Sequence, residues 1–265
     1  GWGFTINDEI ENLRAAQEHL KIVNLGATAI GTTVTAAPGY PELAVKNLAE
    51  LTGIDFKNSE DLIAATSDCG AYMTLSSAIK GLAVKMTKVC NDIRLLASGP
   101  RCGLKEINLP QLQPGSSIMP GKVNPVAAEV ANQASFLAIG LDTTVMLAAS
   151  AGQLELNVME PVITFALYTQ MKVMTNACDT LRTKLVEGVT ANTERCKDYV
   201  MNSIGIVTLL KPHFGYQKCA AIAKEGYTTG KSLHQIVVDE QHLMTQAEWD
   251  ATFNTQNLIH PKFVK

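Results

Sequence analysis

The chain has 265 residues, of which 46% are hydrophobic and 18% are charged, and its formal net charge is −3 at pH 7. A chain of this length and composition can bury a sizeable core, in one large or two modest domains. No basic run is present, which argues against nucleic acid as a partner, and an acidic substrate would have to be bound by a few placed groups.

Four long stretches carry apolar residues at helical spacing, namely 6–20, 75–96, 126–148 and 163–185. In the second stretch the steps alternate between four and three, from Leu75 through Ile79 and Leu82 to Met86. Such spacing packs helices nearly parallel, as in a bundle. Between the first two stretches the sequence predicts shorter helices, one ended by Gly53 and one with a capped start within 58–70. We therefore expect an all-α fold built on a bundle of long helices.

The third stretch is apolar nearly all round. Between residues 125 and 154 the only charged residues are Glu129 and Asp142. A helix of this kind is buried by other helices or spans a membrane. Polar residues argue against a membrane span because each costs free energy in lipid: Asn132, Gln133, Ser135, Asp142, Thr143 and Thr144.

Beyond Gly188 the pattern changes to short helices joined by loops, and Thr245 with Glu248 fits a capping box. We expect residues 1–190 to form the central helical bundle and residues 191–265 to form a small C-terminal helical domain.

The cysteines and histidines show no metal-site pattern. None of the six cysteines forms a C-x-x-C pair, and none lies at metal-ligand spacing from a histidine. This predicts no metal site and favours a reducing, cytoplasmic compartment. Asp68 beside Cys69 could form a reactive pair. Because no basic neighbour would lower the pKa of the thiol, we favour a turn-forming aspartate and a buried cysteine.

The stretch "PGSSIMPGKVNPV", residues 114–126, combines loop-forming residues with chemistry. Asn124 is a favoured N-cap and Pro125 suits the first helical position, so a helix should begin here. The N-terminus of a helix attracts a carboxylate or phosphate, and Lys122 adds a full positive charge. Ser116 and Ser117 follow Gly115, where the backbone bends easily. The loop therefore pairs anion binding with hydroxyl groups.

The string "GSSIMPGKVNP" resembles the signature of the aspartase/fumarase superfamily, and "VNLGATAIGT", "NDIRLLASGPRCGLKEINLP" and "GQLELNVMEPVI" are similar to the same family. The segments "EINLPQLQ", "ELNVMEPVI" and "YVMNSIGIVTLL" resemble the aspartate-deaminating branch more than the fumarases. The resemblance implies a carbon–nitrogen lyase that converts L-aspartate reversibly to fumarate and ammonia, without an organic cofactor. It also implies a homotetramer with active sites shared between subunits. A fumarase-type hydro-lyase remains an alternative.

The resemblance also implies residue roles. Ser116 would be the catalytic base, which removes a proton beside the substrate carboxylate and forms an aci-carboxylate. Glu129 would pair with a histidine from elsewhere. The residues expected to bind substrate are Ser117, Met119, Lys122 and Asn124.

The sequence departs from the family at that histidine. The family carries a Thr-His pair upstream of its bundle core, whereas none of the five histidines here follows a threonine. We therefore expect this chain to be the C-terminal part of such an enzyme, without the N-terminal domain and the first bundle helices. On its own it could be a catalytically silent oligomerisation module.

Two further polar sites leave alternatives open. Arg101, in "SGPRCG", could bind a carboxylate or form a structural salt bridge. Glu155, Asn157 and Glu160 precede Pro161, and we favour a bundle joint there over direct contact with substrate.

Overall fold

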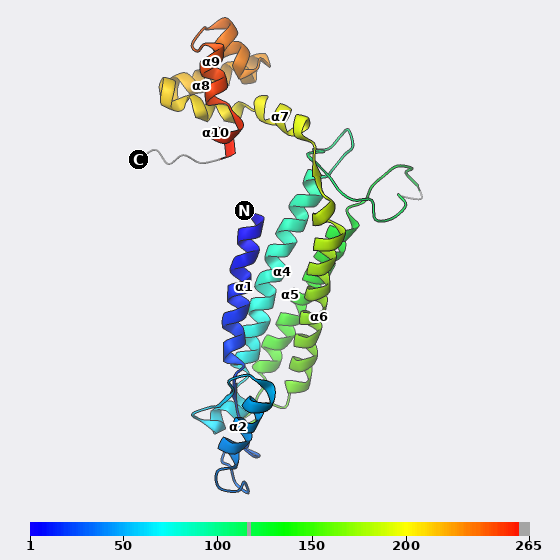
Figure 1. Cartoon of the computed structure of the whole chain (residues 1–265), viewed down its shortest axis with the longest axis vertical. Helices are drawn as coiled ribbons and strands as arrows, with labels where there is room; N and C mark the ends of the chain where they lie inside the picture. The colour runs from blue at the N-terminus through cyan, green and yellow to red at the C-terminus, as the bar shows by residue number, and fades with distance from the viewer. Residues whose placement is uncertain (116–117, 260–265) are drawn as a thin grey trace. The chain divides into compact units, whose positions relative to one another are not determined.

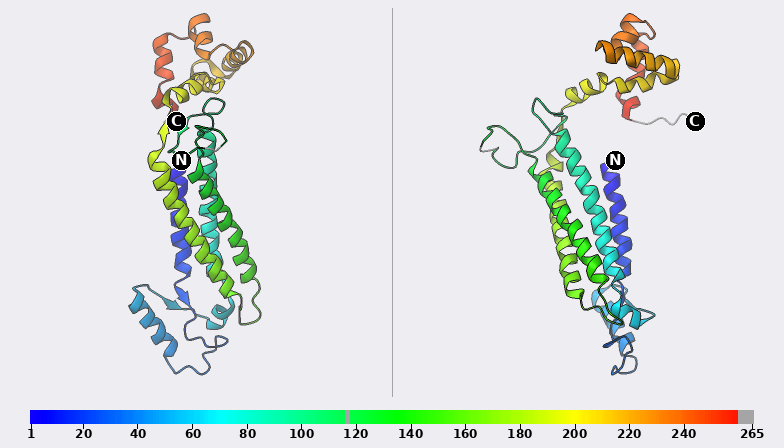
Figure 2. Two further views of the ribbon diagram at one scale, coloured as in Figure 1. Left: turned by 90° about the vertical axis from the view of Figure 1, so that its right-hand side faces the viewer. Right: turned by 180° about the vertical axis from the view of Figure 1, so that it is seen from behind.

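Apolar residues that recur at three- and four-residue spacing form the four main helices. The computed structural model describes residues 1–115 and 118–259 (Figure 1). The long helices are α1 (Trp2–His19), α4 (Gly70–Leu96), α5 (Val126–Ala149) and α6 (Glu160–Lys184). They run side by side as a bundle, as the views in Figure 2 show. The prediction of an all-α fold is confirmed.

The bundle core contains many small side chains. α4 packs against α1, α5 and α6, and α5 packs against α6. Fully buried alanines line these contacts, among them Ala83, Ala128, Ala131, Ala138 and Ala166. Small residues at a contact allow helix axes to approach closely.

A polar cluster crosses this core at one level. The carboxylate of Asp142 accepts a hydrogen bond from Ser76 Oγ at 2.7 Å and pairs with Lys80 Nζ at 2.5 Å. Gln170 Nε2 of α6 donates to Ser76 Oγ at 3.1 Å and to the carbonyl oxygen of Ala138 at 2.9 Å. Three helices are thus joined by hydrogen bonds inside the bundle.

Short elements cover the end of the bundle where α1 finishes. They are α2 (Tyr40–Thr52), α3 (Leu62–Ser67) and the parallel strands β1 (Ile22–Val23) and β2 (Lys57–Asn58). α2 ends at Gly53, whose φ is 70°, and Asp61 caps α3 by accepting from Ile63 N at 2.9 Å. Both predicted helix boundaries are confirmed. A second small sheet joins β3 (Ile107–Asn108) to β4 (Thr190–Ala191), and the short helix η1 (Val186–Gly188) precedes β4.

The chain folds as two compact units, Gly1–Thr190 and Ala191–Lys265. The second unit contains α7 (Thr193–Met201), η2 (Ile204–Leu210), α8 (Lys211–Thr229), the π-helix η3 (Gln235–Glu240), α9 (Gln246–Thr252) and α10 (Thr255–Ile259). Leu210, Ile222, Ile236 and Trp249 lie in its core. The predicted capping box of Thr245 and Glu248 is present, which confirms that prediction.

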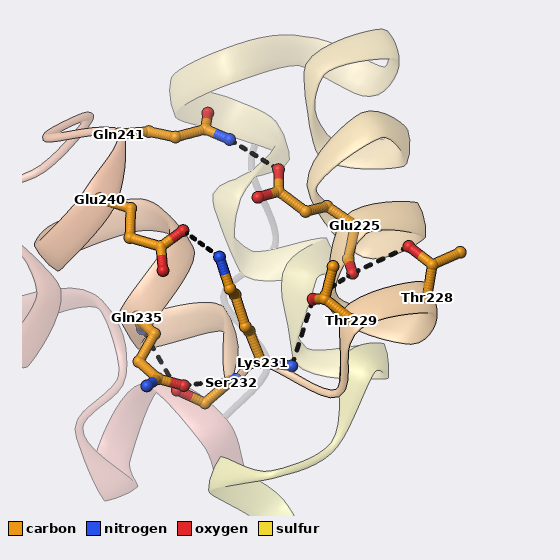
Figure 3. A network of polar contacts seen from close by, with 8 residues as sticks. All are labelled: Glu225, Thr228, Thr229, Lys231, Ser232, Gln235, Glu240 and Gln241. Carbon is orange, nitrogen blue, oxygen red and sulfur yellow. Dashed lines mark hydrogen bonds and ion pairs between the residues drawn. The ribbon is translucent and has the colours of Figure 1, made fainter.

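A polar network ties α8 to η3 within the second unit (Figure 3). Lys231 Nζ pairs with Glu240 Oε2 at 2.7 Å, and Gln241 Nε2 donates to Glu225 Oε2 at 2.8 Å. These contacts hold together both sides of the turn after Gly230, which has a φ of 72°.

Across the described residues, no helix combines the length and the apolar character that crossing a membrane requires.

Candidate active site

The signature loop is the stretch at residues 114–126. Within it, the main chain of Lys122 comes back to Gly115. A Cβ on Gly115 would lie 2.5 Å from the main-chain oxygen of Lys122, so only glycine permits this approach. Lys122 N donates to the carbonyl oxygen of Met119 at 3.3 Å, across a turn centred on Pro120 and Gly121. The φ of Gly121 is 80°, which glycine tolerates at the third position of a type II turn. The predicted residues Ser116 and Ser117 lie outside the described residues.

The segment before the loop is anchored to the end of α4. Ser98 accepts two hydrogen bonds from the main chain ahead of it, from Lys105 N at 2.8 Å and from Leu104 N at 3.1 Å. A side chain on Gly103 would overlap the main chain of Ser98. The stretch "SGPRCG" is therefore a tight turn that directs the chain into the loop.

The start of α5 differs from the prediction by one residue. The N-cap is Pro125 rather than Asn124, α5 begins at Val126, and the N-cap residue forms no side-chain capping hydrogen bond. Pro125 has a ψ of 50°, outside the helical region, which moves the start of the helix past the proline. The first main-chain bond of the helix runs from Glu129 N to the carbonyl oxygen of Pro125 at 3.0 Å.

The predicted site residues that the structure describes lie together around this helix start. Met119 and Lys122 are exposed, Asn124 is half-buried just before the helix, and Glu129 is half-buried in its first turn. A cation, an amide, a carboxylate and a helix N-terminus thus occupy one short segment. Such a segment can bind a carboxylate group and stabilise negative charge that develops on it.

A cavity of about 430 Å³ lies at the opposite end of the bundle, and no sequence motif indicated it. The end of α1, the β1 segment, α3 and the first turns of α4 and α6 contribute its lining, which includes His19, Asn24, Ser59, Asp68, Tyr72 and Glu160. Burial, and then the nearby Glu160 carboxylate, raise the pKa of the Tyr72 hydroxyl. The lining residues come from segments far apart in the chain, so no local motif could reveal them.

Asp68 and Cys69 have structural roles. Asp68 Oδ1 accepts from Gly70 N at 3.1 Å, and Cys69 is only 2% exposed. Burial is the main cause that raises the pKa of the Cys69 thiol. The favoured interpretation of this pair as a turn and a buried cysteine is confirmed.

The joint between α5 and α6 depends on Asn157, which is buried. Its Nδ2 donates to the carbonyl oxygen of Ala148 at 3.0 Å, and its Oδ1 accepts from Met159 N at 2.9 Å. Asn157 thus links the end of α5 to the start of α6, as a bundle joint requires.

Two known protein families match parts of this chain. A family described as "Lyase" matches residues 1–140, and a family described as "Fumarase C C-terminus" matches residues 206–260. Together with the helical bundle and the signature loop, these matches show that the chain belongs to the aspartase/fumarase superfamily of lyases.

Similar proteins carry more specific names. The chain is 55% identical over 258 residues to the aspartate ammonia-lyase of Escherichia coli K12, covering 97% of this chain and 54% of that protein. It is 49% identical over 264 residues to the aspartate ammonia-lyase of Helicobacter pylori 26695, covering 100% of this chain and 56% of that protein. The chain therefore spans about half the length of the curated relatives it matches.

Solved structures share the fold. A fumarate lyase:delta crystallin from Brucella melitensis, bound to cobalt, superposes with a TM-score of 0.89 at 39% identity, covering 95% of this chain and 54% of that one. A class II fumarase from Schistosoma mansoni has a TM-score of 0.89 at 29% identity, covering 98% of this chain and 58% of that one.

Proposed function

We propose that this chain provides the signature loop and much of the helical core of an aspartate ammonia-lyase, which in the complete subunit converts L-aspartate reversibly to fumarate and ammonia. The observation that carries the proposal is the loop that Gly115 closes against Lys122 just before the start of α5. The names of the relatives at 49–55% identity support the choice of aspartate as substrate.

In the proposed reaction, Ser116 acts as the base. Its ionised oxygen takes a proton from the carbon next to the reacting carboxylate, and the released electron pair forms a dianionic aci-carboxylate. That pair then forms the carbon–carbon double bond, and the protonated amino group, –NH3+, leaves as ammonia with the electrons of the carbon–nitrogen bond. The proton on Ser116 returns to solvent.

The remaining loop residues would stabilise charge. Lys122, Asn124 and the first main-chain N–H groups of α5 are the donors proposed for the aci-carboxylate, where preorganised donors act most strongly. Ser117 and Met119 would contact the substrate. Glu129 would pair with a histidine supplied by another segment and would orient it.

We also propose a homotetramer with shared active sites. Two of the long helices expose large apolar side chains in the described part of the chain: Val130, Phe136, Leu137, Met146 and Leu147 on α5, and Val162, Phe165 and Tyr168 on α6. Clustered exposed apolar residues mark interaction surfaces. A molar mass of one subunit at micromolar concentration, measured by light scattering on the complete protein, would overturn this part.

The reaction is tested by following the ultraviolet absorbance of fumarate formed from L-aspartate by complete subunits that carry this sequence. We expect turnover of aspartate and its loss in Ser116→Ala. Turnover of malate in place of aspartate would assign a fumarase-type hydro-lyase. No turnover of either substrate would leave the chain as a silent structural module. Full activity of Ser116→Ala would show that another residue is the base.

A further inference from the structure

A buried asparagine lies one turn beyond Glu129 on α5. Asn132 is 3% exposed, and its Nδ2 donates to Oδ1 of Asn91 on α4 at 2.8 Å. This side-chain bond joins α4 to α5 in the first two turns of α5, next to the signature loop.

The bond fixes which way the Asn132 amide faces. Oδ1 of Asn91 also accepts from Arg94 Nη1 at 3.4 Å, so Asn91 presents its oxygen to both donors. Turning the Asn132 amide over would place two oxygens against each other. Its Oδ1 therefore points elsewhere, where it is buried and has no hydrogen-bond partner in the described residues.

This arrangement is poor for stability, which indicates another role. One hydrogen bond is formed, but one buried acceptor is left unsatisfied, and that costs free energy. An apolar side chain of similar volume would hold the helices together at least as well.

The surface of α5 beside Asn132 is built from small side chains and interlocks little with its neighbours. Ala127, Ala128 and Ala131 are the buried neighbours of Asn132 on α5, and small side chains form a smooth surface. A single buried polar contact can specify the alignment of packed helices where the apolar surface does not. Glu129 precedes Asn132 by three residues, so the two side chains lie about 60° apart around the helix axis.

We propose that Asn132 is a positioning residue, which through Asn91 fixes the rotation of the first turns of α5 and thereby the direction of Glu129. The inference rests on the proposed function. Substrate geometry in this site depends on the helix start, and small displacements of catalytic groups lower the rate strongly.

The test uses complete subunits with Asn132→Leu and Asn91→Leu. For Asn132→Leu we expect an unchanged or higher thermal midpoint, a kcat at least tenfold lower, and a KM within about threefold. Asn91 is exposed, so Asn91→Leu removes the acceptor without disturbing the core and should lower kcat similarly. Asn91→Asp keeps the accepting oxygen and should retain kcat within about twofold.

Gln170→Met is the matched control. Gln170 is also a fully buried amide with an unpartnered oxygen, but it lies in α6 beside Ser76, at the level of Asp142. It should change stability while leaving kcat within about twofold. The proposal is overturned if Asn91→Leu keeps the parent kcat, or if Gln170→Met lowers kcat as much as Asn132→Leu does.

A second measurement separates this inference from the proposed function. Hydrogen–deuterium exchange of peptides covering residues 122–134 should be faster in Asn91→Leu than in the parent and unchanged in Asn91→Asp. If the parent does not deaminate aspartate, the proposed function fails while this exchange pattern still supports positioning by Asn132. Equal exchange in all three proteins would overturn the positioning role.

Discussion

Gly115 and Lys122 meet main chain to main chain, at a separation that leaves no room for a side chain on residue 115. The contact closes the signature loop and brings the main chain of Lys122 beside Gly115. The geometry of the loop therefore depends on one glycine outside the residues that would touch substrate.

Replacing this glycine should impair catalysis more than folding. In Gly115→Ala, the new methyl group must push the main chain of Lys122 away. We expect kcat of the complete enzyme to fall by about tenfold to a hundredfold, with little change in the thermal midpoint, because the loop is displaced from its donors. Gly3→Ala, at a helical position with open space around it, is the control. Parent-like kcat in Gly115→Ala would contradict this account.

Removing the charge of Lys122 should lower kcat more than Gly115→Ala does. Lys122→Met deletes one proposed donor to the aci-carboxylate, and loss of a single such donor lowers kcat by about 10²–10³-fold. Steady-state fumarate formation measures the effect. The matched substitution Lys46→Met, on the exposed face of α2 where Lys46 lies 3.9 Å from Glu50, should leave kcat unchanged. A rate loss below fivefold would exclude Lys122 from charge stabilisation.

The polar cluster inside the bundle should matter for stability. Asp142→Asn removes the charge that pairs with Lys80 and disturbs the acceptor of Ser76. We expect the free energy of unfolding to fall by about 2–3 kcal/mol, measured by urea denaturation of this chain. Asp179→Asn, which breaks an exposed pair with Arg182, should leave unfolding essentially unchanged. Equal effects of the two substitutions would argue against a structural role for the cluster.

Acid should weaken the contact between α1 and α4. A hydrogen bond from Lys85 is the main cause that holds the pKa of Glu9 below its ordinary value of 4.5. Because the folded pKa is lowered, this contribution is full above pH 4.5 and is lost as the pH falls through the folded pKa. Glu9→Gln should therefore be less stable than the parent at pH 7, and the difference should shrink towards pH 3. A difference that is independent of pH would refute this.

The cysteines should differ sharply in reactivity. Burial is the main cause that raises the pKa of the Cys90 thiol to about 11, and this residue is 0% exposed. Cys102 is exposed. At pH 8 a thiol reagent should label Cys102 within minutes and Cys90 only after unfolding, since the thiolate is the reactive form. Peptide mass spectrometry after timed labelling would reveal the opposite order.

Much of the fold was predictable because it follows local rules. The three–four spacing of Leu75, Ile79 and Leu82 predicted a long helix, and Gly53 and the Thr245 capping box marked helix ends that the structure contains. The start of α5 was misplaced by one residue, because the backbone at Pro125 is turned out of the helix by the loop before it.

The candidate site was predictable only in part. The signature residues follow one another in the chain, so Lys122, Asn124 and Glu129 could be grouped from the sequence. The side chains that position these residues could not be identified from the sequence. Asn91 and Asn132 are separated by 41 residues, and nothing in either local pattern indicates that their side chains meet.

The sequence by itself determined where the helices form, that they pack as a bundle, and which family the signature loop belongs to. These properties depend on residue spacing and on contiguous motifs. Only the tertiary structure decided that Gly115 closes on Lys122, that Asp142, Ser76 and Gln170 join three helices, and that a cavity forms at the far end of the bundle. Those features arise from side chains that packing brings together across long separations in the chain, where hydrogen-bond geometry and steric fit are set by the folded neighbours.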